Sequence, residues 1–184
     1  MKTQLGIASL LLMRVFLAPV SISAQQPTTI YVSRADSNCT GHSPCFKTIQ
    51  AAIDAAGPGN TIRIQPGTYP EQVSISDKNN FPSATEIDRI VVEADPGAPS
   101  GSVFLTGSPG PQCTDKFAIR LKQSRFVTIR GLNITGTGGQ AISLLGGNNQ
   151  NQDIHIELNR IFANGSSSCN GGRCDRFVAI ECAR

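Results

Sequence analysis

The chain has 184 residues, of which 16% are charged, and a formal net charge of +3. This length favours a single domain. Because Lys and Arg form no cluster, we expect no nucleic-acid partner. The 18 glycines and the many Asn, Ser and Thr residues are typical of a β-rich extracellular protein with tight turns.

The first 24 residues predict a secretory signal peptide. Lys2 precedes an apolar run over 5–20, and the small residues SISA follow it. A short membrane anchor is the alternative, but Arg14 interrupts the run, and a span needs about 20 uninterrupted apolar residues. We therefore expect a secreted, periplasmic or cell-surface protein with no membrane span once 1–24 are removed.

The cysteine pattern favours disulfides over a metal site. An exported chain with an even number of cysteines typically forms disulfides, and two close pairs predict loop bridges, Cys39–Cys45 and Cys169–Cys174. Metal binding is the alternative, since His42 lies between the first pair, but the sequence has no matching second half of a tetrahedral site. The pairing of Cys113 and Cys182 stays open.

One short helix is predicted near the start of the mature chain, after a strand over 29–33. In 48–56 the apolar residues follow the i, i+3, i+4, i+7 spacing of one helix face: Ile49, Ala52, Ile53 and Ala56. Thr48 is suited to the N-cap, and Gly57 before Pro58 is a stop signal. The rest of the chain predicts strands.

The stretch NTIRIQPGTYPEQVSI, 60–75, shows alternation of apolar and polar residues on both sides of Pro66-Gly67. Alternation with a period of two predicts strands with one buried face. The turn between them could belong to a hairpin, a sandwich corner or one repeat of a coiled β-structure.

Internal repetition decides between these alternatives. VTIRGLNITGTG and IHIELNRIFANG align with an offset of 27 residues. Earlier strands recur after 28 and 37 residues: Ile62 and Ile64, then Ile90 and Val92, then Val127 and Ile129. A second set recurs after 23 and 36 residues: Ile119 and Leu121, then Ile142 and Leu144, then Val178 and Ile180.

Short strands of constant length joined by loops of variable length predict a right-handed parallel β-helix over 28–184, with an all-β core and the helix 48–56 as its N-terminal cap. Like residues would stack inside it, and Pro66-Gly67 would be a corner. A sandwich would need hairpin signals every 8–12 residues, and few are present.

The sequence PCFKTIQAAIDAAGPGNTIRIQPGTYPEQVSI resembles the N-terminal cap and first coil of the pectate-lyase-like superfamily of β-helices. RIVVEADPGAPSGSVFLTGS and RFVTIRGLNITGTGGQAISLLGG resemble the coils that follow. The resemblance covers about 28–182 and implies a polysaccharide-active protein, most directly a lyase of acidic polysaccharide such as pectate, and a monomer. The alternative is a non-catalytic extracellular β-helix that binds glycans or has a structural role.

In such lyases a cation, usually Ca²⁺, neutralises the uronate carboxylate and a Lys or Arg removes a proton. The resemblance places the substrate face on strands 117–121, 141–144 and 177–182, where Arg120, Ser143, Ala179 and Glu181 point outward. We take Arg120, Ser143 and Glu181 as the substrate-facing candidates. The residues themselves identify no cofactor and no metal site, and the catalytic residues stay undetermined.

A second outward face predicts a ladder of charges. Gln65, Glu93, Arg130 and Glu157 are placed in one column, beside a second column of Arg63, Val91, Thr128 and His155. An ion-pair ladder is favoured over a groove that binds sugar or a cation. Asn159 fits an inward corner asparagine, and Tyr69 fits a packed corner aromatic.

The sequence RFVAIECAR ends inside an expected strand, so we expect a β-helix truncated at its C-terminal end, with catalytic coils beyond it. Asn38, Asn133 and Asn164 begin Asn-x-Ser/Thr sequons, which matter in a eukaryotic secretory pathway.

Overall fold

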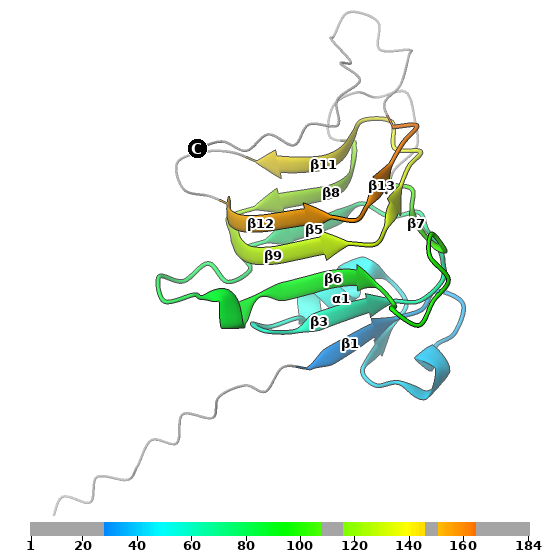
Figure 1. Ribbon diagram of the computed structural model, residues 1–184, viewed down its shortest axis with the longest axis horizontal. Helices are drawn as coiled ribbons and strands as arrows, with labels where there is room; N and C mark the ends of the chain where they lie inside the picture. Colours follow the sequence, from blue (N-terminus) through cyan, green and yellow to red (C-terminus); the bar gives the residue numbers. More distant parts are fainter. Residues whose placement is uncertain (1–27, 108–115, 146–150, 165–184) are drawn as a thin grey trace, which may run out of the picture.

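The computed structural model describes residues 28–107, 116–145 and 151–164, which form three parallel sheets and one α-helix (Figure 1). Sheet A contains, in spatial order, β12 (Asn151–Glu157), β9 (Ser124–Arg130), β6 (Ile90–Ala94), β3 (Thr61–Ile64), β1 (Thr29–Val32) and β2 (Cys45–Phe46). Sheet B contains β13 (Arg160–Ile161), β10 (Asn133–Ile134), β7 (Val103–Leu105) and β4 (Gly67–Tyr69). Sheet C contains β11 (Gln140–Leu145), β8 (Phe117–Lys122) and β5 (Val73–Ser76).

Consecutive strands pass from sheet A to sheet B to sheet C and then return to sheet A. This order holds for β3–β4–β5, β6–β7–β8 and β9–β10–β11, and it begins again with β12 and β13. The strands 61–64 and 73–76 therefore lie in different sheets, and the turn at Pro66-Gly67 is a corner rather than a hairpin.

The core lies between the sheets and consists of stacked aliphatic side chains. In sheet A, one inward column runs through five strands in register: Ile30, Ile62, Val92, Ile129 and Ile156. The first four are at most 3% exposed. Full burial of such a side chain stabilises the fold by about 1.5–3 kcal/mol, so the alternation in the sequence specifies which face of each strand points inward.

The register confirms most of the predicted offsets. Val127 lies opposite Ile90 and Ile154, and Ile119 lies opposite Ile142, as the offsets of 37, 27 and 23 require. The predicted offset of 28 between the first two strands is wrong, because Ile62 pairs with Val92, thirty residues later. A shift of two residues keeps the same side chains inward, so the alternation cannot distinguish the two registers.

Asparagine side chains hold the corners between neighbouring repeats. Asn159 accepts a hydrogen bond from the Leu132 N–H (3.0 Å) and donates to the Ile129 carbonyl (2.8 Å). Asn151 and Asn164 make the same pair of bonds, each to an N–H 27 residues earlier and to a carbonyl 30 residues earlier. The corner role predicted for Asn159 is confirmed, and two equivalent asparagines join it.

The predicted helix is confirmed as α1 (Ile49–Ala55), with the Thr48 side chain accepting from the Ala51 N–H. The helix packs beside β5, the edge strand of sheet C. The amide of Gln50 donates to the Ser74 carbonyl (3.1 Å) and accepts from the Ser74 N–H (2.7 Å), as a neighbouring strand would. The helix thus protects this edge from other strands.

Residues on either side of β5 bind the two ends of α1. The Glu71 carboxylate accepts from the N–H groups of Ile49 (2.9 Å) and Gln50 (3.1 Å). The Lys78 ammonium donates to the Ala56 carbonyl (2.8 Å), and partial burial lowers the pKa of Lys78. An anion at the N-terminus and a cation at the C-terminus complement the helix dipole.

The predicted disulfide Cys39–Cys45 is confirmed, and it closes a loop that contains the 3-10 turn η1 (Cys39–Gly41). A second 3-10 turn, η2 (Glu86–Asp88), lies between β5 and β6. The predicted pair Cys169–Cys174 and the predicted signal peptide 1–24 lie outside the described residues, as do Cys113 and Cys182. In the part of the chain that the structure describes, helices fall short of the length and hydrophobicity that a membrane span requires.

Candidate functional site

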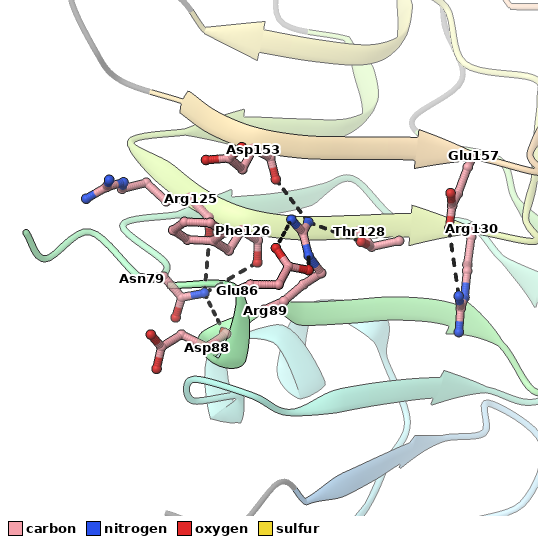
Figure 2. Close-up of polar contacts among 10 residues, drawn as sticks. All are labelled: Asn79, Glu86, Asp88, Arg89, Arg125, Phe126, Thr128, Arg130, Asp153 and Glu157. Atoms are coloured by element: carbon pink, nitrogen blue, oxygen red, sulfur yellow. Dashed lines mark hydrogen bonds and ion pairs between the residues drawn. The ribbon is translucent and has the colours of Figure 1, made fainter. Parts of the chain in front are cut away.

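The outer face of sheet A carries a ladder of alternating charges. Register places Arg63, Glu93, Arg130 and Glu157 side by side on β3, β6, β9 and β12. Glu93 Oε1 lies 3.2 Å from Arg63 Nε, and Glu93 Oε2 lies 2.6 Å from Arg130 Nη2. Arg130 Nη1 lies 3.7 Å from Glu157, the pair drawn at the right of Figure 2.

The predicted ladder is therefore confirmed with one correction, which follows from the register of β3. Arg63, and not Gln65, is the partner of Glu93. Gln65 is 9% exposed, and its amide donates to the Cys39 carbonyl of the disulfide loop (3.0 Å). Thr61, and not Arg63, belongs to the neighbouring column with Val91, Thr128 and His155.

The ladder neutralises its own charge. Glu93 has only 5% of its side chain exposed and is bonded to two arginines. The hydrogen bond to Glu93 raises the pKa of Arg63. Two cations and two anions in contact leave no excess charge on this column, so its chemistry is that of an ion-pair network rather than of a site for a charged ligand.

A second polar cluster on sheet A fixes the η2 turn against the later strands (Figure 2). The Arg89 guanidinium donates to the Glu86 carboxylate (2.5 and 2.6 Å), to Thr128 Oγ1 (3.3 Å) and to the Asp153 carbonyl (3.0 Å). The hydrogen bond from Arg89 lowers the pKa of Glu86. These contacts join η2 to β9 and β12, and they position the loop rather than create a reactive group.

The outer face of sheet C contains two of the three substrate-facing residues predicted from the sequence, Arg120 and Ser143. Arg120 lies between Ser74 and Ser143 in register on β5, β8 and β11. Its guanidinium carbon lies 3.9 Å from the centre of the Phe117 ring. Ser143 is 6% exposed. The third candidate, Glu181, lies outside the described residues.

Lys122 also lies on this face and is not among the residues predicted from the sequence. Lys122 is exposed and lies opposite Ser76 on β5 and Leu145 on β11. Its alternation with Arg120 was the available signal, since residues 120 and 122 point to the same side of a strand. The outer face of sheet C thus combines two cations with the hydroxyl groups of Ser74 and Ser76, while Ser143 beside Arg120 is buried.

The outer faces of sheets A and C differ in charge. The strands of sheet C, namely 73–76, 117–122 and 140–145, contain Arg120 and Lys122 and no Asp or Glu. Calcium sites are built from carboxylate and carbonyl oxygens, so these strands do not fit the Ca²⁺ that the family resemblance implies. Among all the described residues, no three His, Cys, Asp or Glu side chains are placed to hold a metal ion.

No family model, no curated protein and no solved structure matches this chain. The chemistry of the site is therefore inferred from its own residues. The described strands of sheets B and C both carry positive charge without Asp or Glu, but sheet B supplies Arg160 alone, whereas sheet C combines Arg120 and Lys122. The outer face of sheet C is the candidate functional site.

Proposed function

We propose that the protein is an exported right-handed parallel β-helix of the pectate-lyase-like kind, which binds acidic polysaccharide on the outer face of sheet C. The passage of consecutive strands through sheets A, B and C supports the β-helix. Right-handedness is supported by general stereochemistry, because about 98% of crossovers between parallel strands have that hand. The disulfide Cys39–Cys45 supports export to an oxidising compartment.

The observation that carries the binding proposal is the composition of sheet C. Its strands supply Arg120 and Lys122 without any carboxylate. Charge-assisted hydrogen bonds between such cations and a uronate carboxylate are about twice as strong as neutral ones. The hydroxyl groups of Ser74 and Ser76 beside them are suited to sugar hydroxyl groups. Phe117 beneath Arg120 holds the guanidinium in place through a cation–π contact.

A second candidate function is the lyase reaction that the resemblance implies. One observation favours it. Arg and Lys are the residue types that remove the proton in such lyases, and Arg120 and Lys122 both lie on the outer face of sheet C. The absence of carboxylates from the described strands of sheet C weighs against a lyase that depends on a bound cation. Binding without catalysis is therefore the stronger proposal.

The binding proposal is tested with polygalacturonate and the full mature chain in isothermal titration calorimetry. Lys122→Gln removes one exposed charge from the face, and we expect affinity to fall by roughly tenfold, the equivalent of one charge-assisted hydrogen bond. The control is Lys47→Gln, an exposed lysine outside sheet C, whose affinity should match the wild type. Equal binding by wild type and Lys122→Gln, or no binding at all, would reject the proposal.

The same samples separate a binder from a lyase. A lyase generates an unsaturated uronate, which is followed by its ultraviolet absorbance. Binding without any increase in absorbance supports the non-catalytic protein. Binding with an increase that is lost in Lys122→Gln or Arg120→Gln supports the lyase instead.

A further inference from the structure

The three Asn-x-Ser/Thr sequons are Asn38-Cys39-Thr40, Asn133-Ile134-Thr135 and Asn164-Gly165-Ser166. Such a sequence accepts an N-linked glycan only where the asparagine amide lies at the surface. The structure places the three asparagines in very different surroundings, so it distinguishes them where the sequence does not.

The first sequon lies on an exposed loop. Asn38 is exposed, and its side chain makes no capping hydrogen bond to the η1 turn that follows it. Only its backbone is engaged: the N–H donates to Asp36 Oδ1 (2.8 Å), and the carbonyl accepts from the Gly41 N–H (2.8 Å). The Nδ2 atom is therefore available for a new covalent bond without loss of a bond that supports the fold.

The residues around Asn38 hold the loop in a defined shape. Cys39 is fully buried and disulfide-bonded to Cys45, which anchors the middle of the sequon to the protein. The Thr40 N–H donates to the second oxygen of Asp36 (2.6 Å). These bonds lower the pKa of Asp36. The loop is thus fixed from within, while Asn38 itself stays exposed.

The side-chain amides of the other two asparagines are engaged in hydrogen bonds within the fold. Asn133 is 4% exposed on β10, and its amide donates to the Val103 carbonyl (3.1 Å). Asn164 uses both amide hydrogens, which bond to the carbonyls of Ile134 (2.9 Å) and Phe162 (3.0 Å). A sugar on Asn164 would replace one of these two bonded hydrogens, and a sugar on Asn133 has no room at a buried amide.

We propose that Asn38 is an N-glycosylation site and that Asn133 and Asn164 carry no glycan in the folded protein. The reaction joins Asn38 Nδ2 to the anomeric carbon of an oligosaccharide carried on a lipid diphosphate. The bond between that carbon and the diphosphate oxygen breaks, the lipid diphosphate leaves, and the amide proton passes to a base of the transferase. Thr40, two residues after Asn38, is exposed and completes the acceptor, and its hydroxyl oxygen accepts a hydrogen bond from the Gln65 amide (3.3 Å).

This inference rests on the proposed export, because the transfer occurs inside a secretory compartment. The full chain with its own residues 1–24 is expressed in a eukaryotic secretory cell, together with a version in which a cleavable signal of known activity replaces them. Failure of the first version alone to reach the medium would contradict the predicted signal peptide. The second version still reports on glycosylation.

Secreted protein is treated with peptide-N-glycosidase and analysed by gel shift and peptide mass mapping. We expect a single glycan, located on the peptide that contains Asn38. The shift should disappear in Asn38→Gln and should be unchanged in Asn133→Gln and Asn164→Gln, provided that these variants are secreted. If either of the latter fails to fold, the wild-type peptide map alone decides the assignment.

An unshifted wild type, or a glycan mapped to Asn133 or Asn164 of the secreted protein, would overturn the inference. Neither result affects the binding of polygalacturonate to sheet C, which is measured on protein without glycan. Export, glycosylation and polysaccharide binding therefore succeed or fail separately.

Discussion

Glu93 is the residue on which the charge ladder of sheet A depends. Its carboxylate is almost fully buried and accepts hydrogen bonds from arginines on both neighbouring strands. Arg63 and Arg130 keep 37% and 43% of their side chains exposed, so water screens part of the attraction. The ladder therefore stabilises the stacking of β3, β6 and β9 through one shared anion.

Replacing Glu93 by Gln should lower the free energy of unfolding by about 1–2 kcal/mol, because charge-assisted bonds on both sides are weakened while the arginines can still be solvated. Glu157→Gln is the matched control. Glu157 is 47% exposed at the end of the ladder and lies 3.7 Å from Arg130. We expect its replacement to lower the free energy of unfolding by less than about 0.5 kcal/mol. Urea denaturation gives the free energy of unfolding of both variants. Equal losses in Glu93→Gln and Glu157→Gln would contradict the central role of Glu93.

Asp36 should make the disulfide loop sensitive to acid. The backbone N–H groups of Asn38 and Thr40 hold the pKa of Asp36 below its ordinary value of 3.8. The folded state then binds fewer protons than the unfolded state near that value. The contribution of Asp36 to stability is thus complete above pH 3.8 and is lost as the pH falls toward the lower folded pKa.

We expect Asp36→Asn to be less stable than the wild type at neutral pH, with a difference that shrinks by about pH 3. Urea midpoints of both proteins at the two pH values give this difference, and other titrating carboxylates cancel from it. A difference that stays constant or grows on acidification would refute the assignment.

At the scale of the element, the sequence predicted most strands and the one helix correctly. The spacing of Ile49, Ala52 and Ile53 gave α1 because a short amphipathic helix has a clear period. The register of β3 was missed, since offsets of 28 and 30 both keep Ile62 and Ile64 inward. The hydrogen bonds of Glu71, Gln50 and Lys78 that fix α1 beside β5 could not be predicted, because they depend on the three-dimensional position of β5.

The role of the corner asparagines is visible in their hydrogen bonds and not in a repeat of the sequence. Asn159 lies 27 residues after Leu132, so position alone does not reveal an asparagine column. The hydrogen bonds instead show that each asparagine of the last described repeat reaches back to the repeat before it. The side chain thus satisfies backbone groups at a corner where no strand continues.

Asn159→Leu restores the residue type found 27 positions earlier but leaves the Leu132 N–H and the Ile129 carbonyl without their side-chain partner. We expect a loss of about 1–3 kcal/mol in the free energy of unfolding. Asn80→Leu, an exposed asparagine outside the corners, should change stability by less than about 0.5 kcal/mol. A corner variant no less stable than the control, in thermal or urea unfolding, would show that these bonds add nothing.

In the molecule as a whole, the parallel register gives the outer faces of sheets A and C different chemistry. It stacks cation on anion over sheet A, and it stacks Arg120 between serines over sheet C. The predicted candidates Arg120 and Ser143 thus lie side by side as neighbours, while the strand predicted around Val178 and Glu181 lies outside the described residues. Period and alternation predicted the faces. The burial of Ser143 could not be predicted from a single strand.

The stacking of parallel strands underlies both faces, and methyl–methyl nuclear Overhauser effects in Ile- and Val-labelled protein measure it directly. We predict contacts that join Ile90 to Val127 and Ile62 to Val92, pairs that are 37 and 30 residues apart and that meet only in the parallel register. A hairpin across Pro66-Gly67 would instead bring β3 directly against β5 as antiparallel neighbours. Contacts of that hairpin, without those between Ile90 and Val127, would contradict the fold and both surfaces derived from it.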